Sequence, residues 1–101
     1  MIDRNGYRPS LLQEDHEKCF LCGRGGPVER HEIFGAAYRK KSKADGLWVS
    51  LCGECHRDGR QAVHNDYTAA LALKKQGELC WLAEYNKTRD DFIREYGRDY
   101  L

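Results

Sequence analysis

The chain contains two C-x2-C segments, Cys19-Phe20-Leu21-Cys22 and Cys52-Gly53-Glu54-Cys55, with residues 23–51 between them. Each segment can present two thiolates to one tetrahedral ion at about 2.3 Å. Four thiolates fill the coordination shell and leave no position open for a substrate, so the sequence predicts a structural zinc site. The alternatives are two disulfides or free buried thiols, and a reducing compartment favours zinc over both. The predicted ligands are Cys19, Cys22, Cys52 and Cys55.

The length and composition predict one domain with a small core. At 101 residues, of which 41% are hydrophobic and 33% charged, the chain has too little interior for two separate cores. A core of this size benefits from a metal staple, which agrees with zinc binding. We expect a polar, loosely packed N-terminal arm over residues 1–18, interrupted by Gly6 and Pro9. A single domain is expected over residues 19–101.

The sequence predicts a cytoplasmic protein. No run approaches the roughly 20 apolar residues that span a bilayer, and the start Met1-Ile2-Asp3-Arg4-Asn5 lacks the apolar core of a signal peptide. Lys and Arg total 17 against 16 acidic residues, so the net charge of +1 gives no general attraction to nucleic acid. Such an attraction must come from a local patch.

The region between and after the cysteine pairs predicts two strands. Residues 28–34 predict the first strand, with Glu29, His31 and Ile33 on one face if the strand is regular. Residues 47–51 predict the second strand, which runs into the second cysteine pair. A helix or knuckle is expected to begin there. Residues 35–46 predict mainly a basic loop with room for a short helical turn.

The C-terminal part predicts helices. Apolar residues recur with helical spacing from about Tyr67 to Tyr85, and Asp66 is a suitable N-cap. Thr88, followed by Asp91, predicts the cap of a last short helix that ends at Gly97. Together with the two strands, these helices predict an α+β fold: a small zinc-stapled domain with a two-stranded hairpin, a helix and additional C-terminal helices.

Three histidines lie near the predicted strands and cysteine pairs. His31 is on the first strand, His56 directly follows a predicted zinc ligand, and His64 precedes the long helix. A helix turns about 100° per residue, so Cys55 can face the zinc while His56 points elsewhere. If the strands pack beside that helix, His31 and His56 converge on a second metal with positions open for water and phosphate. His16, in the polar arm, is expected at the surface.

The order of these motifs resembles that of the ββα-metal (HNH) nucleases, especially the compact phage-type group related to RecA-dependent recombination nucleases. The resemblance covers about residues 19–101. It implies a metal-dependent endonuclease that nicks or cleaves DNA during phage or bacterial DNA processing, in the bacterial cytoplasm. It also implies that His31 and His56 hold one divalent ion, Mg²⁺ or Mn²⁺, which stabilises the leaving 3′ oxygen. The matching segments are Glu29-Arg30-His31-Glu32-Ile33-Phe34-Gly35, Arg39-Lys40-Lys41-Ser42, Gly46-Leu47, Leu51-Cys52, Cys55-His56, Ala62-Val63-His64-Asn65 and the closing residues 92–101.

Members of that family commonly have a metal ligand on the first strand followed by a histidine that activates water. Here His31 matches the ligand, and Glu32 occupies the position of the base. With a reference pKa of about 4.3, a glutamate is a weaker base near neutrality than a histidine unless burial raises its pKa. Neighbours on a regular strand point to opposite faces, so a bulge or strand end at these residues is required.

His64 has three open roles at this stage: it can replace the missing base, join the metal as a third ligand, or cap the following helix. The basic run between the strands has two interpretations. Cations beside the site can hold phosphates without reading sequence, whereas a solvated loop is the alternative. The candidate phosphate ligands are Arg39, Lys40, Lys41 and Lys43.

Two other function classes fit the same residues. A non-catalytic zinc-stapled module that binds DNA or a protein would leave His31 and His56 as packed or surface residues. A thiol redox switch would release zinc on oxidation, because C-x2-C thiolates are oxidisable. Cys80, Trp48 and Trp81 lie in apolar segments and are expected in the core.

Overall fold

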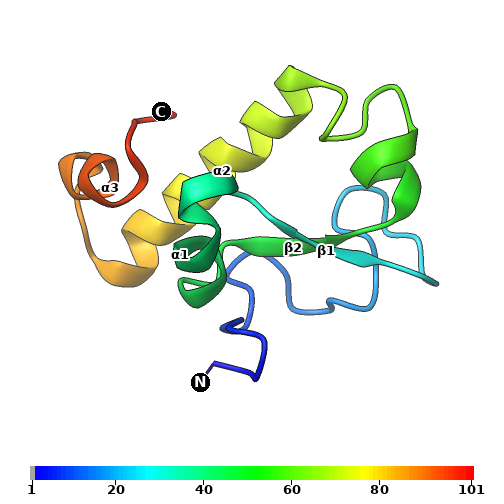
Figure 1. The fold of residues 1–101 in the computed structure, drawn as a ribbon, viewed down its shortest axis with the longest axis horizontal. Helices are drawn as coiled ribbons and strands as arrows, with labels where there is room; N and C mark the ends of the chain where they lie inside the picture. The colour runs from blue at the N-terminus through cyan, green and yellow to red at the C-terminus, as the bar shows by residue number, and fades with distance from the viewer. Residues whose placement is uncertain (1) are drawn as a thin grey trace.

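A computed structural model describes residues 2–101 as a small α+β fold (Figure 1). None of the helices in this range has the length and apolar content needed to span a membrane. The elements in chain order are β1 (Glu29–Glu32), the 3₁₀ helix η1 (Ala36–Tyr38), α1 (Arg39–Ala44), β2 (Trp48–Leu51), the π-helix η2 (Glu54–Asp58), α2 (Tyr67–Tyr85) and α3 (Arg89–Tyr96).

The two strands pair as a regular antiparallel hairpin. Glu29 lies opposite Leu51 and Glu32 opposite Trp48, with one partner for each residue between them. The predicted hairpin is therefore confirmed, although β1 is shorter than residues 28–34. Because successive side chains of a strand point to opposite faces, this register separates His31 from its neighbour Glu32.

The segment between the strands is mainly helical, whereas the sequence predicts mainly a basic loop with a short helical turn over residues 35–46. It forms η1 and α1. The hydroxyl of the fully buried Ser42 donates a hydrogen bond to Leu47 O at 2.6 Å and accepts one from Phe34 N at 3.1 Å. This polar side chain anchors α1 to both flanking segments. A pattern of apolar residues could not reveal such a helix.

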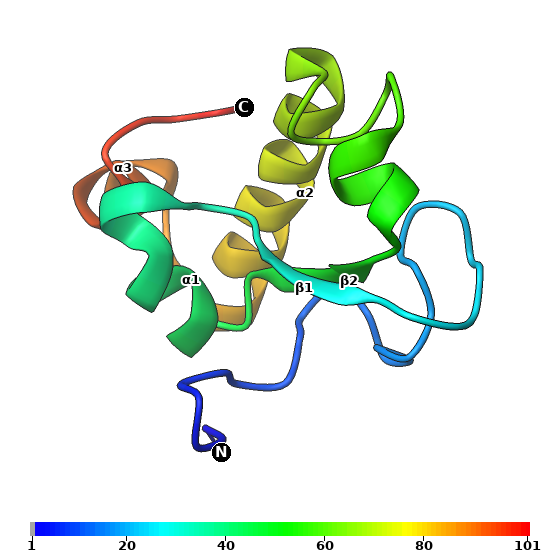
Figure 2. The ribbon, with the colours of Figure 1, turned by 45° about the vertical axis from the view of Figure 1, so that its right-hand side comes forward.

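The C-terminal helices agree with the sequence. Asp66 caps α2 by accepting hydrogen bonds from the backbone N–H of Thr68 and Ala69. Thr88 and Asp91 form a capping box at the start of α3. α2 lies along one side of the hairpin, and α3 packs near its C-terminal end (Figures 1 and 2). The core between them contains Phe34, Leu47, Val49, Leu73, Trp81, Phe92 and Tyr96.

The N-terminal arm packs more closely than the sequence predicts. It runs beneath the hairpin (Figure 2), and Arg8 reaches the C-terminal end of α2, where it pairs with Glu84. Tyr7 is buried, and the indole N–H of Trp48 donates to Arg8 O at 2.7 Å. Leu11 N donates to Gly46 O at 2.9 Å, and a Cβ at Gly46 would come within 2.7 Å of Pro9 O. The arm therefore completes the lower face of the hairpin.

Candidate metal centres

The four predicted zinc ligands come together beside the start of η2. The Sγ atoms of Cys19, Cys22, Cys52 and Cys55 all lie within 4.8 Å of one another. Cys22 Sγ and Cys52 Sγ are 3.7 Å apart, which is the edge of about 3.8 Å expected between two sulfurs bound to one tetrahedral ion at about 2.3 Å. A disulfide would require about 2.05 Å. The four cysteines can therefore hold a structural metal ion such as zinc.

The charge balance of the cysteine cluster also suits a cation. Burial acts to raise the pKa of Cys19, but hydrogen bonds from the backbone of Cys52, Cys22 and Leu21 outweigh it and lower the pKa to about 6. Burial and the three neighbouring thiols raise the pKa of Cys55. One thiolate is thus stabilised by the backbone, while four thiolates need a positive ion among them.

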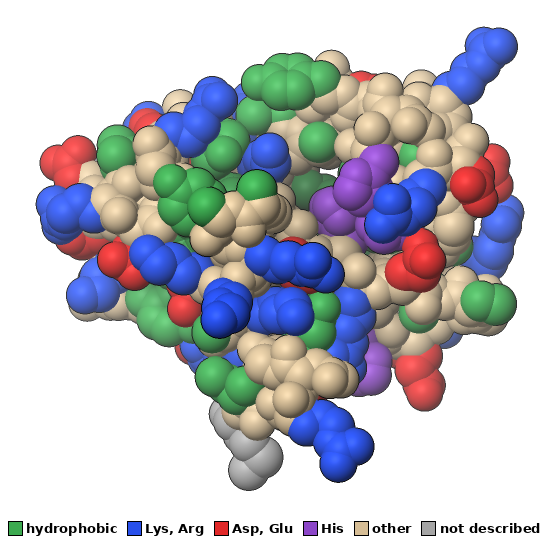
Figure 3. Space-filling view, in the orientation of Figure 1, with side chains coloured by type: hydrophobic (Ala, Val, Ile, Leu, Met, Phe, Trp, Pro, Cys, Tyr) green, Lys and Arg blue, Asp and Glu red, His purple; other side chains and the backbone are tan. Residues whose placement is uncertain are grey.

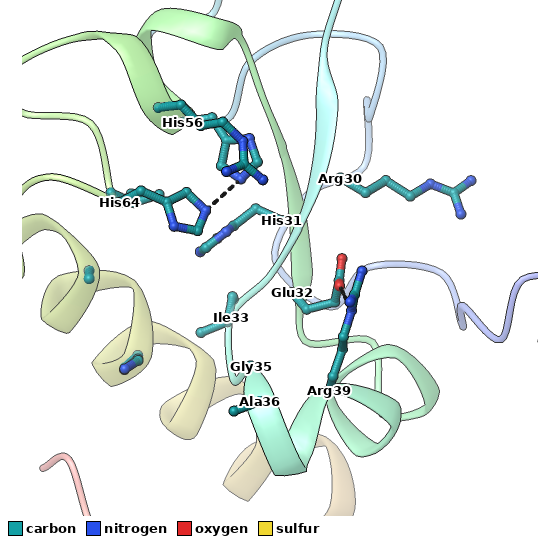
Figure 4. A pocket seen from close by; sticks show the side chains of 13 residues that line it. Arg30, His31, Glu32, Ile33, Gly35, Ala36, Arg39, His56 and His64 are labelled. Carbon is teal, nitrogen blue, oxygen red and sulfur yellow. Dashed lines mark hydrogen bonds and ion pairs between the residues drawn. The ribbon is translucent and has the colours of Figure 1, made fainter.

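The structure gathers a second group of possible ligands from the three histidines predicted near the site. His31 comes from β1, His56 from η2 and His64 from the turn before α2, and one ring nitrogen of each lies within 4.8 Å of the others. Figure 4 shows the three rings converging. His56 Nε2 and His64 Nε2 are 3.0 Å apart, within hydrogen-bond distance, and this spacing also fits two ligands at right angles about 2.1 Å from one ion. The group can hold a second metal ion.

A carboxylate orients one of these histidines. Glu29 Oε1 lies 2.6 Å from His56 Nδ1. Because a carboxylate only accepts, the His56 Nδ1–H donates to it, and the Nε2 lone pair of a neutral ring points toward the other histidines. This hydrogen bond lowers the pKa of Glu29. Sequence reasoning did not single out Glu29, although strand alternation places it on the same face as His31.

The rings of His31 and His64 are kept neutral near pH 7. Burial above all, and then the neighbouring His56 and His64, lower the pKa of His31 to about 4. Burial, His56 and Arg57 lower the pKa of His64. The neutral imidazole is the form that ligates a metal ion.

The two candidate centres share one short element. Cys55 and His56 are consecutive residues of η2 and face different centres. The turn that brings His64 into place is tied to η2 through the backbone, because Val63 N donates to Cys55 O at 2.9 Å and His64 N donates to His56 O at 3.2 Å. The segment that carries Cys55 therefore also positions His56 and His64, whereas β1 positions His31.

Glu32, the predicted base, is not brought into the histidine group. The hairpin has no bulge, and the Glu32 side chain points to the opposite face of β1 (Figure 4). There it accepts hydrogen bonds from Tyr7 Oη at 2.8 Å and Arg39 Nε at 2.6 Å. Burial acts to raise the pKa of Glu32, but these two hydrogen bonds outweigh it, so the pKa is lowered. The carboxylate is a weak base in this setting.

The histidines open onto a cleft of about 440 Å³ between β1, η1, η2 and α2. Arg39, Arg57 and Lys74 are among the residues that line it. Basic side chains lie beside the histidines and over α1 on the same face of the molecule (Figure 3). The cleft therefore combines possible metal ligands with cations that suit a phosphate group.

The predicted basic patch is only partly at the cleft. Of the candidate residues, Arg39 lines the cleft, whereas Lys41 Nζ donates to Glu95 O at 3.0 Å and Lys43 Nζ lies 4.8 Å from the Tyr7 ring centroid. Lys40 is exposed on α1 and is not among the residues that line the cleft. Arg57 and Lys74 also line the cleft and were not among the predicted residues. The available signal for Arg57 was its position next to His56.

The remaining assignments follow from the packing. Asp66, rather than His64, caps α2, which removes one of the three roles considered for His64. His16 is exposed, as predicted. Trp48 and Trp81 are buried in the core, and Cys80 is half-buried in α2.

No family model, curated protein or solved structure matches this chain, so its function is inferred from the geometry of the two centres.

Proposed function

We propose that this protein is a metal-dependent endonuclease of the HNH type that hydrolyses phosphodiester bonds in DNA. The observation that supports it is a group of three imidazoles that opens onto a cation-lined cleft, separate from a four-cysteine site. A four-thiolate shell has no open position, whereas three imidazoles leave positions for water and a phosphate oxygen. The cysteine site therefore suits a metal ion that stabilises the fold, and the histidine site suits a metal ion that takes part in hydrolysis.

The proposed ligands of the reactive ion are His31, His56 and His64. Imidazole nitrogens suit the later transition metals, and Mn²⁺ and Mg²⁺ are the candidates that the resemblance implies. When bound, such an ion supplies Lewis-acid stabilisation of the phosphate and of the leaving 3′ oxygen. The carboxylate of Glu29 keeps the His56 ring in the orientation that points Nε2 into the group.

The cations of the cleft are assigned to the phosphate backbone. Arg57 of η2 and Lys74 of α2 line the cleft together with the histidines, and Arg39 of α1 also lines it and pairs with Glu32. Contacts of this kind position a strand without reading its bases. We therefore expect little sequence preference.

The residues that line the cleft offer no free base for the attacking water once the three histidines bind a metal ion. Among the residues that line the cleft, the three imidazoles are the stronger proton acceptors, since the pKa of Glu32 is lowered and its carboxylate points to the opposite face of β1. With the imidazoles bound to metal and Glu32 paired to Arg39, the attacking water would lose its proton to solvent or to the substrate phosphate. A positioned base contributes roughly 10² to 10⁴-fold, so we expect slow turnover.

The decisive experiment is cleavage of supercoiled plasmid by the zinc-loaded protein with added Mn²⁺ or Mg²⁺. We expect metal-dependent nicking by the parent and none by His56→Ala. His16→Ala is the matched control, because it removes an exposed histidine outside the group. Circular dichroism and zinc content show that each variant is folded.

No cleavage of plasmid or single-stranded DNA with either ion would contradict the nuclease. Equal cleavage by His56→Ala and the parent would contradict the assignment of the histidine group. The first result would favour the alternative function, a zinc-stapled module that binds DNA or a protein without cutting.

A further inference from the structure

One line along α2 connects the histidine cleft with an exposed aromatic side chain. At about 100° per residue, positions seven and eleven residues after Tyr67 return to within about 20° of it. These positions are Lys74 and Glu78. Tyr67 is 70% exposed, the largest exposure among the large hydrophobic residues of the described chain. Lys74 lines the cleft.

The C-terminal tail, residues 97–101, is held against the same line of α2. Tyr100 N donates to Glu78 Oε1 at 2.7 Å, and Arg89 Nε donates to Asp99 Oδ2 at 3.0 Å. Glu78 is fully buried, and its Oε2 has no hydrogen-bond partner in the described chain. Burying a carboxyl with one oxygen unpaired costs free energy. The fold therefore maintains the position of Tyr100 at a cost to stability.

The tail adds an aromatic ring and a cation to the line. The Tyr100 ring centroid lies 5.5 Å from Lys74 Nζ and 4.7 Å from Arg98 Cζ. The ring also packs against Phe34, with centroids 5.4 Å apart. Aromatic rings and cations thus alternate from Tyr67 through Lys74 to the tail, and Lys74 belongs both to this surface and to the cleft.

We propose that this surface, made of Tyr67, Lys74, Arg98 and Tyr100, binds a single strand of nucleic acid that leaves the histidine cleft. The proposal rests on the proposed function, which supplies the strand. Proteins hold single strands by cations along the backbone and by aromatic rings on which bases stack. A duplex keeps its bases stacked on each other, so an exposed ring such as that of Tyr67, beside the half-buried ring of Tyr100, favours an unpaired strand. A chain of net charge +1 needs such a local surface to attract a polyanion.

Fluorescence anisotropy with a labelled oligothymidine of about 12 nucleotides, without added divalent ions, tests the surface. We expect Tyr67→Ala and Tyr100→Leu each to weaken binding about fivefold or more, since stacking on one ring contributes at least that much. Arg98→Ala should reduce the slope of log affinity against log salt by about 0.7. Tyr100→Phe keeps the ring and should bind like the parent.

Two matched controls remove similar groups elsewhere. Leu79→Ala removes an exposed apolar side chain, 56% exposed, on a different side of α2. Arg94→Ala removes an exposed α3 arginine that pairs with Asp91. Both should bind the oligonucleotide like the parent. Melting temperatures confirm that the variants are folded.

The proposal is overturned if Tyr67→Ala and Arg98→Ala bind like the parent, if the parent does not bind the oligonucleotide, or if blunt duplex competes as well as single strand. Plasmid cleavage by the parent tests the nuclease separately from strand binding. If the parent cleaves plasmid and the variants bind the oligonucleotide as tightly as the parent, only the strand-binding surface is contradicted. If the variants bind more weakly and the parent does not cleave, only the nuclease is contradicted.

Discussion

At the scale of single residues, Glu29 has the most specific predicted effect. The hydrogen bond that it accepts from His56 Nδ1 holds the ring with Nε2 toward His64, another of the proposed metal ligands. Glu29→Gln removes the charge and should weaken metal binding at the histidines roughly 10 to 100-fold. Calorimetric titration of the zinc-loaded protein with Mn²⁺ measures this. Glu54→Gln, an exposed glutamate of η2, is the control, and equal affinity in both variants would exclude the orienting role.

Glu78 predicts a pH dependence of stability. Burial above all, together with the facing Asp99, raises the pKa of Glu78 to about 7 from the usual 4.5. Between these values the folded chain keeps a proton that the unfolded chain releases, so the free energy of unfolding falls as the pH rises through this window. Glu78→Gln cannot ionise and should therefore be more stable than the parent above about pH 7.

Thermal melts across this pH range measure the effect, with Glu95→Gln as an exposed glutamate control. We expect the advantage of Glu78→Gln to shrink as the pH falls below about 4.5, because Glu78 then becomes protonated in the unfolded chain as well. Parallel curves for Glu78→Gln and the parent would show that the buried carboxyl is not the cause.

At the scale of elements, η2 depends on the cysteine cluster. Its Cys55 belongs to the predicted zinc site, and the next residue, His56, belongs to the histidine group. Cys19→Ser should lose zinc and unfold the domain, because binding of a structural metal contributes directly to folding. Cys80→Ser is the matched control and should keep both zinc and fold. A folded, zinc-free Cys19→Ser protein would disprove the structural role.

The elements differ in how well the sequence predicted them. The long helix from Tyr67 to Tyr85 and the capping box of α3 depend on local spacing, which a sequence displays directly. α1 depends on the buried hydroxyl of Ser42, whose partners Phe34 and Leu47 lie outside the helix. Such contacts have no periodic signature, and the segment therefore resembled a loop.

At the scale of the whole molecule, the sequence predicted that His31 and His56 would converge, but it predicted only some of the other residues that line the cleft. The cysteine spacing fixes where η2 begins, and the hairpin brings β1 beside it. Lys74 reaches the cleft from α2, a long way along the chain, and only the packing of α2 on the hairpin reveals this. The prediction of Glu32 as the base required a bulge that would turn its side chain toward His31, and the strands pair without one.

The N-terminal arm has a consequence for the order of folding during synthesis. Arg8 pairs with Glu84, 76 positions later, and Arg8 O accepts from the Trp48 indole. These partners leave the ribosome long after Arg8 does. The cysteine pairs can close around zinc as soon as residue 55 has emerged, whereas the arm must wait for α2 before it can settle. The N-terminal arm is thus synthesised first but is among the last segments to reach its folded position.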